Sequence, residues 1–466
     1  MKPLYRLIFC TVLLSGIVGC TKSEKPEKVI RDDNAAYRPK EFVKLKHPEW
    51  SKNATIYEVN IRQYTPEGTF TAFADHLPRL KEMGVDIIWL MPIHPIGIKN
   101  RKGSLGSYYS VRDYYGINPE FGTMAEFKSL VNKIHASGMH VIIDWVANHS
   151  AWDNPLAAKH PDWYSKTPEG NFQPTPWYDW EDIIDFDYSH PGIRKYMTEA
   201  LLYWVRETNI DGYRCDVAGF MPIDFWDNAR IQLDKIKPVF MLAEWESRDL
   251  HARAFDMTYS WSLWDKMHAV AKDGKNISGL IEYMAHDVST FPRDGYRMTF
   301  TDNHDKNSWE GNQYSNFGKA LEASMVLAGT VNGMPLVYSG QEAGLDRSLR
   351  FFDKDTIQWK EHPFTEIYRK LFTLKHSNQA LWNGKSGGEM VRIYNDKPSQ
   401  VLSFYRDKGT NRVITIINYS PNTASVKLDS KYAAGDYAEL FSEKSYTMSG
   451  DDVLSLKPWE YKVFYR

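Results

Sequence analysis

The chain has 466 residues, with 57 Lys and Arg against 59 Asp and Glu, and a formal net charge of −2 at pH 7. Because this length exceeds what one hydrophobic core usually spans, we expect two or more domains. The near-neutral balance, without long runs of one charge in the folded part, argues against nucleic acid as the main partner. Aromatic residues make up 14% of the chain, and flat rings with polar tips suit a hydroxyl-rich ligand such as a sugar.

The first twenty residues, MKPLYRLIFCTVLLSGIVGC, have the pattern of a targeting segment. Lys2 and Arg6 precede an apolar run at residues 7–18, which is too short to span a bilayer as a mature helix. The segment ends in IVGC, which resembles a bacterial lipobox. This interpretation makes residues 1–20 a lipoprotein signal peptide with its modified cysteine: the chain is cleaved before Cys20, and Cys20 is lipidated. The alternative is an ordinary secretory signal.

Residues 21–40 are polar, charged and proline-containing, which is typical of a flexible tether. We therefore expect a lipid-anchored protein of a bacterial cell envelope. The residue after Cys20 is Thr21, not the aspartate that signals retention in the inner membrane, so the outer membrane is favoured. With Cys10 removed and Cys20 lipidated, Cys215 remains alone, and no disulfide framework is expected.

Residues 54–340 alternate between strand-like and helix-like segments, whose short apolar strands suggest a covered parallel sheet. The strand-like segments are ATIYEVNIRQ, DIIWLMPI, HVIIDWV, GYRCDV, VFMLAEW, MTYSW, RMTFTDN and MPLVYSG. Helical spacing predicts helices over residues 73–83, 124–134, 191–207, 225–236, 277–286, 319–328 and 366–375. Eight such units predict an α/β fold, a (β/α)8 TIM barrel over residues 41–382, with an active site at the C-terminal strand ends. An open doubly wound sheet is the alternative.

Two segments depart from this alternation. Residues 150–190, after the third strand, are loop-like and rich in Trp and Tyr, and we interpret them as a small excursion above the barrel's top face. Residues 383–466 contain short strand-like segments of alternating polarity: MVRIYN, VLSFYR, RVITIINYS, SVKL, YAELF and YKVFYR. This pattern predicts a separate C-terminal antiparallel β-sandwich.

Polar residues gather near the C-terminal ends of four predicted strands. In an extended strand residues i and i+2 point to the same side, so Arg214 and Asp216 face one space while Cys215 points away. Charged side chains in apolar strands are costly unless they line a polar pocket. The residues concerned are Asp144, Arg214 with Asp216, Glu244, and His304 with Asp305. Four strands with the same feature predict one shared site.

These motifs resemble the alpha-amylase family, glycoside hydrolase family 13. DWVANH, GYRCDVA, LAEW and TDNHD resemble its four conserved regions, in order and with barrel spacing. GVDIIWLMPI, GSYYSVRDYYGINPEFGT and GMPLVYSGQE are further matches. The resemblance covers residues 53–341, and the predicted sandwich stands where the family carries its C-terminal domain.

The resemblance implies a retaining hydrolase that cleaves alpha-1,4-glucosidic bonds of starch, glycogen or maltooligosaccharides through a covalent glycosyl intermediate. It implies Asp216 as the nucleophile, Glu244 as the general acid and base, and Asp305 as the residue that stabilises the transition state. An arginine beside a carboxylate favours its ionised form, so Arg214 would keep Asp216 an anion. The implied substrate-binding residues are Tyr109, Asp144, His149, Arg214 and His304.

The chain also departs from the family's pattern. Many members carry Lys-His after the nucleophile, where this chain has VAGF. Asn148 and Asp185 match positions where the family often binds calcium, with a role in a turn or cap as the alternative. No organic cofactor is expected, and the sequence does not indicate protein partners. A transglycosidase of the same family and a non-catalytic alpha-glucan binding protein are the two alternative functions.

Overall fold

The structure is a computed structural model that describes residues 37–38, 40–449 and 452–466. The predicted signal peptide, the lipidation site Cys20 and most of the predicted tether lie outside the described residues. Residues 42–466 form one compact unit. Within the part of the chain that the structure describes, no helix has both the length and the apolar character needed to cross a membrane.

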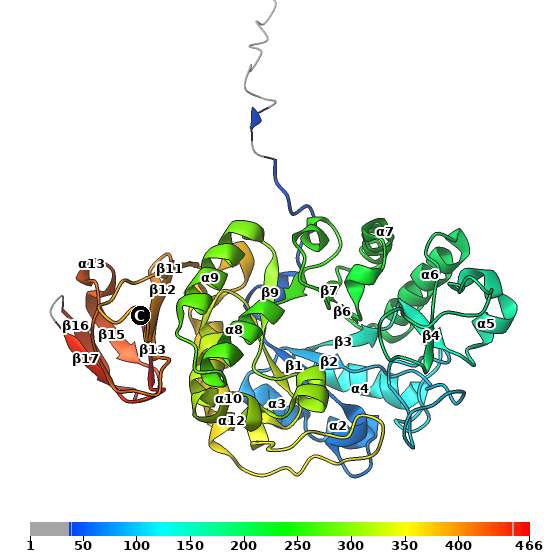
Figure 1. Cartoon of the computed structure of the whole chain (residues 1–466), viewed down its shortest axis with the longest axis horizontal. Helices are drawn as coiled ribbons and strands as arrows, with labels where there is room; N and C mark the ends of the chain where they lie inside the picture. Colours follow the sequence, from blue (N-terminus) through cyan, green and yellow to red (C-terminus); the bar gives the residue numbers. More distant parts are fainter. Residues whose placement is uncertain (1–36, 39, 450–451) are drawn as a thin grey trace, which may run out of the picture. The chain divides into compact units, whose positions relative to one another are not determined.

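Eight parallel strands close into a barrel, as the sequence predicts (Figure 1). They are β1 (Ile56–Val59), β2 (Ile87–Leu90), β3 (His140–Trp145), β6 (Gly212–Cys215), β7 (Phe240–Ala243), β8 (Met257–Tyr259), β9 (Tyr296–Thr299) and β10 (Met334–Tyr338). Their order around the ring is β1-β10-β9-β8-β7-β6-β3-β2, so β10 pairs with β1 and β7 lies opposite β1. Nearly every strand residue is buried, which explains why the strands are continuous apolar runs.

Helices follow the strands of the barrel. They are α1 (Ile61–Tyr64), α2 (Phe70–Ala74), α3 (Leu77–Met83), α4 (Met124–Ala136), α6 (Pro191–Thr208), α7 (Ile223–Leu233), α8 (Trp261–Ala271), α9 (Ser278–Thr290), α10 (Gln313–Phe317), α11 (Leu321–Thr330) and α12 (Pro363–Ser377). Local signals set their ends: Thr123 and Glu126 form a capping box at the start of α4, and α6 begins with Pro191. The predicted single helix over residues 73–83 was wrong. It is divided into α2 and α3, because Pro78 lacks an N–H and fits only the first turn of a helix.

The excursion after β3 is more regular than the loop that the sequence predicts. It contains β4 (His149–Ala151) and β5 (Ile183–Asp185), which pair antiparallel, and α5 (Pro155–Lys159). The β4–β5 register sets His149 opposite Asp185. The rings of Tyr178 and Trp180 stack with their centroids 4.2 Å apart.

The C-terminal residues form an antiparallel sheet domain, as predicted. Its elements are β11 (Glu389–Arg392), β12 (Val401–Lys408), β13 (Asn411–Asn418), β14 (Ala424–Lys427), α13 (Ser430–Ala433), β15 (Gly435–Glu439), β16 (Ser445–Met448), β17 (Val453–Leu456) and β18 (Tyr461–Tyr465). Six strands form one sheet, in the order β11-β12-β13-β18-β15-β16, and β14 pairs with β17. The two sheets share a core that includes Ile414, Val426, Leu456 and Phe464. They therefore form a sandwich of one six-stranded and one two-stranded sheet.

A buried arginine on β12 connects the C-terminal domain to backbone segments that follow α11 and α12. Arg406 on β12 is buried, and its guanidinium donates to the carbonyl oxygens of Val331 at 2.9 Å, Trp382 at 2.8 Å and Gly388 at 3.2 Å. Burial lowers the pKa of Arg406 to about 9, and the charge of Arg293 adds to that effect. Three backbone acceptors from separate segments thus converge on one side chain.

Candidate active site

Arg214 is the centre of the candidate site. It is fully buried, and its Nη1 donates to Asp216 Oδ1 at 2.9 Å and to Asp144 Oδ1 at 2.8 Å. Its Nη2 lies 3.0 Å from Glu244 Oε2, and its Nε donates to the hydroxyl of Tyr259 at 3.2 Å. One guanidinium therefore contacts carboxylates that come from the ends of β3, β6 and β7.

Asp144 supports this arrangement from below the cavity. Its Oδ2 accepts hydrogen bonds from the hydroxyl of Tyr109 at 3.0 Å and from Trp89 Nε1 at 3.3 Å. Burial raises the pKa of Asp144 to about 7, with Arg214 opposing that shift and Asp216 adding to it. Asp144 thus holds the arginine and the tyrosine in place.

Glu244 is held by the backbone that follows the predicted nucleophile. Its Oε2 accepts a hydrogen bond from the N–H of Val217 at 2.6 Å. Val217 has a φ of 35°, a left-handed conformation that is rare for a β-branched residue and strained. Burial raises the pKa of Glu244 well above its usual value; Arg214 opposes this, while Asp216 and Asp305 add to it. Glu244 therefore favours its protonated form.

His304 connects the other predicted site residues. Its Nε2 lies 2.8 Å from the hydroxyl of Tyr109 and 3.3 Å from Asp305 Oδ1, and its Nδ1 lies 2.5 Å from Glu58 Oε1. Burial works against a charged imidazole, but the charges of Asp305 and Glu58 outweigh it and raise the pKa of His304 to about 9. Sequence reasoning missed Glu58. The signal was there, because IYEV places a glutamate inside an apolar strand.

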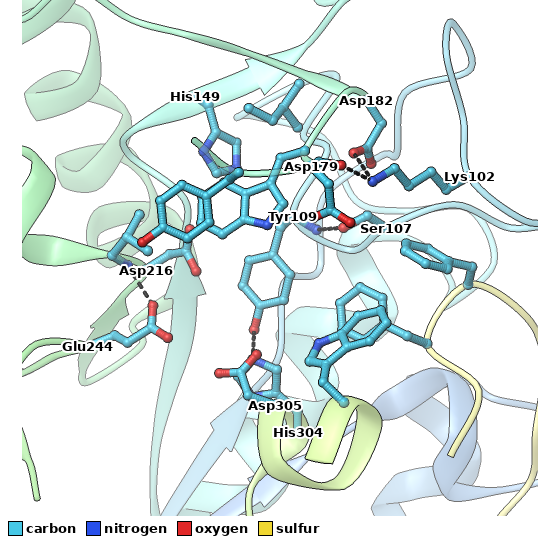
Figure 2. Close-up of a pocket in the computed structure, with 17 residues that line it drawn as sticks. Lys102, Ser107, Tyr109, His149, Asp179, Asp182, Asp216, Glu244, His304 and Asp305 are labelled. Atoms are coloured by element: carbon cyan, nitrogen blue, oxygen red, sulfur yellow. Dashed lines mark hydrogen bonds and ion pairs between the residues drawn. The ribbon is translucent and has the colours of Figure 1, made fainter. Parts of the chain in front are cut away.

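These residues meet at one cavity of about 380 Å³ (Figure 2). Its lining includes six of the predicted site residues: Tyr109, His149, Asp216, Glu244, His304 and Asp305. Arg214 and Asp144, which were predicted to bind substrate, are fully buried behind that lining and do not line the cavity. They support the residues that do. The lining also includes the aromatic rings of Tyr178, Trp180, Trp309, Phe351 and Phe352.

Asn148 and Asp185, the predicted calcium ligands, lie next to each other beside this cavity. Asn148 Nδ2 donates to Asp185 Oδ1 at 3.0 Å, and Thr175 Oγ1 donates to the same oxygen at 2.6 Å. Calcium takes about six to eight oxygen ligands. Among residues 37–38, 40–449 and 452–466, no group of three or more His, Cys, Asp or Glu side chains could hold a metal ion. Calcium also takes amide and backbone carbonyl oxygens, so the site at Asn148 and Asp185 stays a prediction.

The fold and the cavity together define a class of protein. Asp216, Glu244 and Asp305 line a pocket at the C-terminal end of a (β/α)8 barrel, and Arg214 contacts the first two from behind, an arrangement suited to glycoside chemistry. Comparison with known protein families gives the same class. The model of the alpha-amylase catalytic domain matches residues 38–363, and that of the maltogenic amylase C-terminal domain matches residues 391–463. The chain therefore belongs to the alpha-amylase family, and the prediction that it is an enzyme is confirmed at that level.

Individual relatives are moderately similar in sequence. The alpha-amylase MalA of Haloarcula japonica is 28% identical over 434 residues, which are 87% of this chain but 60% of MalA. The maltogenic alpha-amylase of Bacillus acidopullulyticus is 25% identical, and the match covers 89% of this chain and 78% of that enzyme.

Solved structures share the whole fold. The noncanonic maltogenic alpha-amylase AmyB of Thermotoga neapolitana is 32% identical with a TM-score of 0.81, over 89% of this chain and 98% of AmyB. An alpha-amylase of Lactobacillus plantarum is 29% identical with a TM-score of 0.79, over 90% of this chain and 99% of that one.

Proposed function

We propose that the protein is a retaining alpha-glycoside hydrolase that cleaves alpha-1,4-glucosidic bonds of starch, glycogen or maltooligosaccharides. The observation that carries the proposal is the single guanidinium of Arg214, which contacts both Asp216 and Glu244. A retaining pair stands about 5–5.5 Å apart, and carboxyls that share one guanidinium lie close together. The names of the relatives, alpha-amylase and maltogenic alpha-amylase, support an alpha-glucan as the substrate.

In the first step Asp216 attacks the anomeric carbon while Glu244 protonates the glycosidic oxygen. The C–O bond to the leaving group breaks, an ester bond to Asp216 forms, and the shortened chain leaves with the proton of Glu244. Oε2 of Glu244 is occupied by the N–H of Val217 and faces Arg214, so Oε1 carries the proton. Its raised pKa keeps Glu244 protonated at the start of the cycle.

In the second step Glu244, now an anion, takes a proton from a water molecule. The hydroxide that forms attacks the anomeric carbon, the ester bond to Asp216 breaks, and the sugar leaves with its configuration retained. Asp305 and His149 bind the hydroxyls of the reacting sugar, and Tyr109 forms its stacking surface. His304, as an imidazolium, holds Tyr109 and Asp305 in place and puts a positive charge beside the same sugar.

Transglycosylation at the same site is the second candidate. Close to Glu244 the surface presents Phe220 and Tyr178, whose residues are 37% and 50% exposed and whose rings lie 6.0 Å apart. Such rings would bind an acceptor sugar as readily as a leaving group. The maltosyltransferase of Streptomyces coelicolor, 24% identical over 81% of this chain, belongs to the same set of relatives.

The test uses purified residues 21–466 with soluble starch, maltoheptaose and pullulan, and product analysis by chromatography. We expect shorter maltooligosaccharides from the wild type, and loss of that activity in Asp216→Asn. An exposed acid between α8 and α9 provides the matched control, Asp273→Asn, which should keep full activity. Products longer than maltoheptaose would favour the transglycosidase, and the absence of turnover on every glucan would overturn the hydrolase.

We also propose that Cys20 carries the lipid anchor and that the protein belongs to a bacterial cell envelope, with the outer membrane favoured. The support is the IVGC sequence at the end of the apolar run. Expression with a labelled fatty acid tests it. The label should follow the wild type into the membrane fraction and be absent from Cys20→Ala, whereas equal labelling of both would overturn the anchor.

A further inference from the structure

Three loops at the rim of the cavity are joined to one another. Lys102 Nζ donates to the carbonyl oxygen of Asp179 and lies 3.9 Å from Asp182 Oδ1 (Figure 2). On the other side, the backbone N–H and the hydroxyl of Ser104 donate to Asp353 Oδ1 at 2.9 and 2.5 Å. We name this set the clasp, and define it as residues 98–107, 179–182 and 351–354.

The clasp has a built interior. The buried guanidinium of Arg62 donates to the carbonyl oxygens of Gly106 at 3.0 Å and of Phe351 at 3.3 Å. The N–H of Leu105 donates to the carbonyl of Phe352 at 2.9 Å. The backbone at Gly103 is left-handed, with a φ of 61°, and a Cβ there would lie 2.4 Å from the Cβ of Phe352. These contacts fix the loops against each other.

The clasp lies across the cavity from the predicted acid. Residues 98–107 follow β2 and residues 351–354 follow β10, and both strands flank β1. Glu244 follows β7, which lies opposite β1 in the ring. In Figure 2, Lys102, Asp179 and Asp182 lie on one side of Tyr109 and Glu244 lies on the other. The cavity therefore extends from the side of Glu244, which we call the acid wall, to the side of Lys102, Phe351 and Phe352, which we call the clasp wall.

The chemistry gives this axis a direction. Glu244 protonates the oxygen of the leaving group, so the leaving part of the chain extends along the acid wall. The other part, which ends in the nonreducing end of the glucan, extends toward the clasp, where Lys102, Phe351 and Phe352 line the cavity. On the acid side the surface is open and aromatic, with Phe220 5.3 Å from the ring of Trp245.

We propose that the clasp, closed by Lys102, blocks the nonreducing side of the cleft, so that the enzyme removes short maltooligosaccharides from chain ends. This inference rests on the proposed hydrolase function. It makes Lys102 and the Ser104–Asp353 contact determinants of product length. Long chains then bind through the open aromatic side.

The test compares maltoheptaose with maltoheptaose that carries a benzylidene acetal on the terminal nonreducing glucose. A closed end has no room for the acetal, so the wild type should cleave the blocked substrate about tenfold more slowly or worse. Lys102→Ala removes the contacts of Lys102 with Asp179 and Asp182, and Asp353→Ala removes the contacts of Asp353 with Ser104. The double variant therefore separates the three loops of the clasp. This double variant should recover most of the blocked rate and release longer products at early times.

Lys99→Ala is the matched control, because Lys99 is an exposed lysine of the same loop that does not line the cavity. If the double variant unfolds, Lys102→Met replaces it in the test. Methionine has a similar length but loses the ion pair with Asp182. Equal wild-type rates on both substrates, or opened variants with wild-type selectivity, would overturn the clasp while leaving the hydrolase intact. If the wild type cleaves neither glucan, the proposed function fails and this inference fails with it.

Discussion

The carboxylate of Glu58 on β1 lies 2.5 Å from Nδ1 of His304, the residue whose other ring nitrogen faces Tyr109 and Asp305. Glu58 is fully buried, and its second oxygen, Oε2, has no hydrogen-bond partner. The imidazole is thus held between two carboxylates inside the barrel. This pair sets the charge on the side of the cavity that Tyr109 and Asp305 line.

Glu58→Gln should lower the pKa of His304 and weaken the enzyme. The amide keeps the shape of the side chain but removes one negative charge, so the imidazolium is less favoured. We expect kcat/KM to fall by about tenfold, and the loss of activity at alkaline pH to begin at a lower pH than in the wild type. pH–rate profiles on maltoheptaose measure this. An unchanged alkaline limb would show that His304 does not need Glu58 for its charge.

The same pair makes stability depend on pH. The pKa of His304 is raised from 6.5 to about 9 on folding, so its contribution is fully present below pH 6.5 and is lost as the pH rises through 9. The melting temperature of the wild type should therefore fall over that interval more than that of Glu58→Gln. Parallel curves for the two proteins would contradict the shift.

Glu244→Gln should separate acid catalysis from the rest of the mechanism. On maltoheptaose we expect kcat to fall by about a thousandfold, because the glycosidic oxygen leaves without a proton. Alpha-maltosyl fluoride needs no acid to leave, so its first step should be far less affected. Burst kinetics on both substrates measure the difference. Equal losses on both would contradict the acid role of Glu244.

Hydrolysis should release the alpha anomer first. Asp216 and Glu244 share one guanidinium, which supports a double displacement with retention. Proton NMR within the first minutes of maltoheptaose cleavage distinguishes the alpha from the beta anomer before mutarotation mixes them. Initial release of the beta anomer would replace the covalent intermediate with a direct attack by water.

Chelation should leave the melting temperature unchanged. Asp185 Oδ1 already accepts hydrogen bonds from Asn148 and Thr175, and a bound cation would have to displace them. Scanning calorimetry with EDTA and with added calcium tests this expectation. A rise with calcium that disappears in Asp185→Asn would establish the calcium site that the sequence predicts.

Arg406→Met should destabilise the protein by roughly 3 kcal/mol, since it leaves buried carbonyl oxygens at Val331, Trp382 and Gly388 without a donor. Urea unfolding measures the change. Lys408→Met, two residues along β12, is the control and should cost little, because Lys408 is only half-buried and its ammonium makes a hydrogen bond at the surface, to the carbonyl oxygen of Lys385. Equal stability of the two variants would contradict the role of Arg406.

Sequence reasoning succeeded where the information is local. The alternation within β6 puts Arg214 and Asp216 on one side, and the run of eight apolar strands sets the barrel. It failed where a partner lies far along the chain: Glu58 and His304 are 246 residues apart, and nothing near either residue identifies the other. The clasp was missed for the same reason, because the segments that form it follow three different strands.

β16 and β17 were missed for a different reason. Each has four residues, and β17 reads VLSL, an alternation too short to stand out from a loop. The strained φ of Val217 was also beyond local reasoning. A valine has no preference for a left-handed backbone, and the Glu244 carboxyl that accepts from its N–H lies 27 residues further along the chain.

The single guanidinium of Arg214 has a consequence for how this site can diverge. Asp144, Asp216 and Glu244 share one counter-charge, so a substitution at any of them changes the environment of the other two, and their effects should not add. A lineage that kept the barrel but changed its chemistry could not alter these positions independently. Variation in such a lineage is expected to accumulate in the rim loops rather than around Arg214.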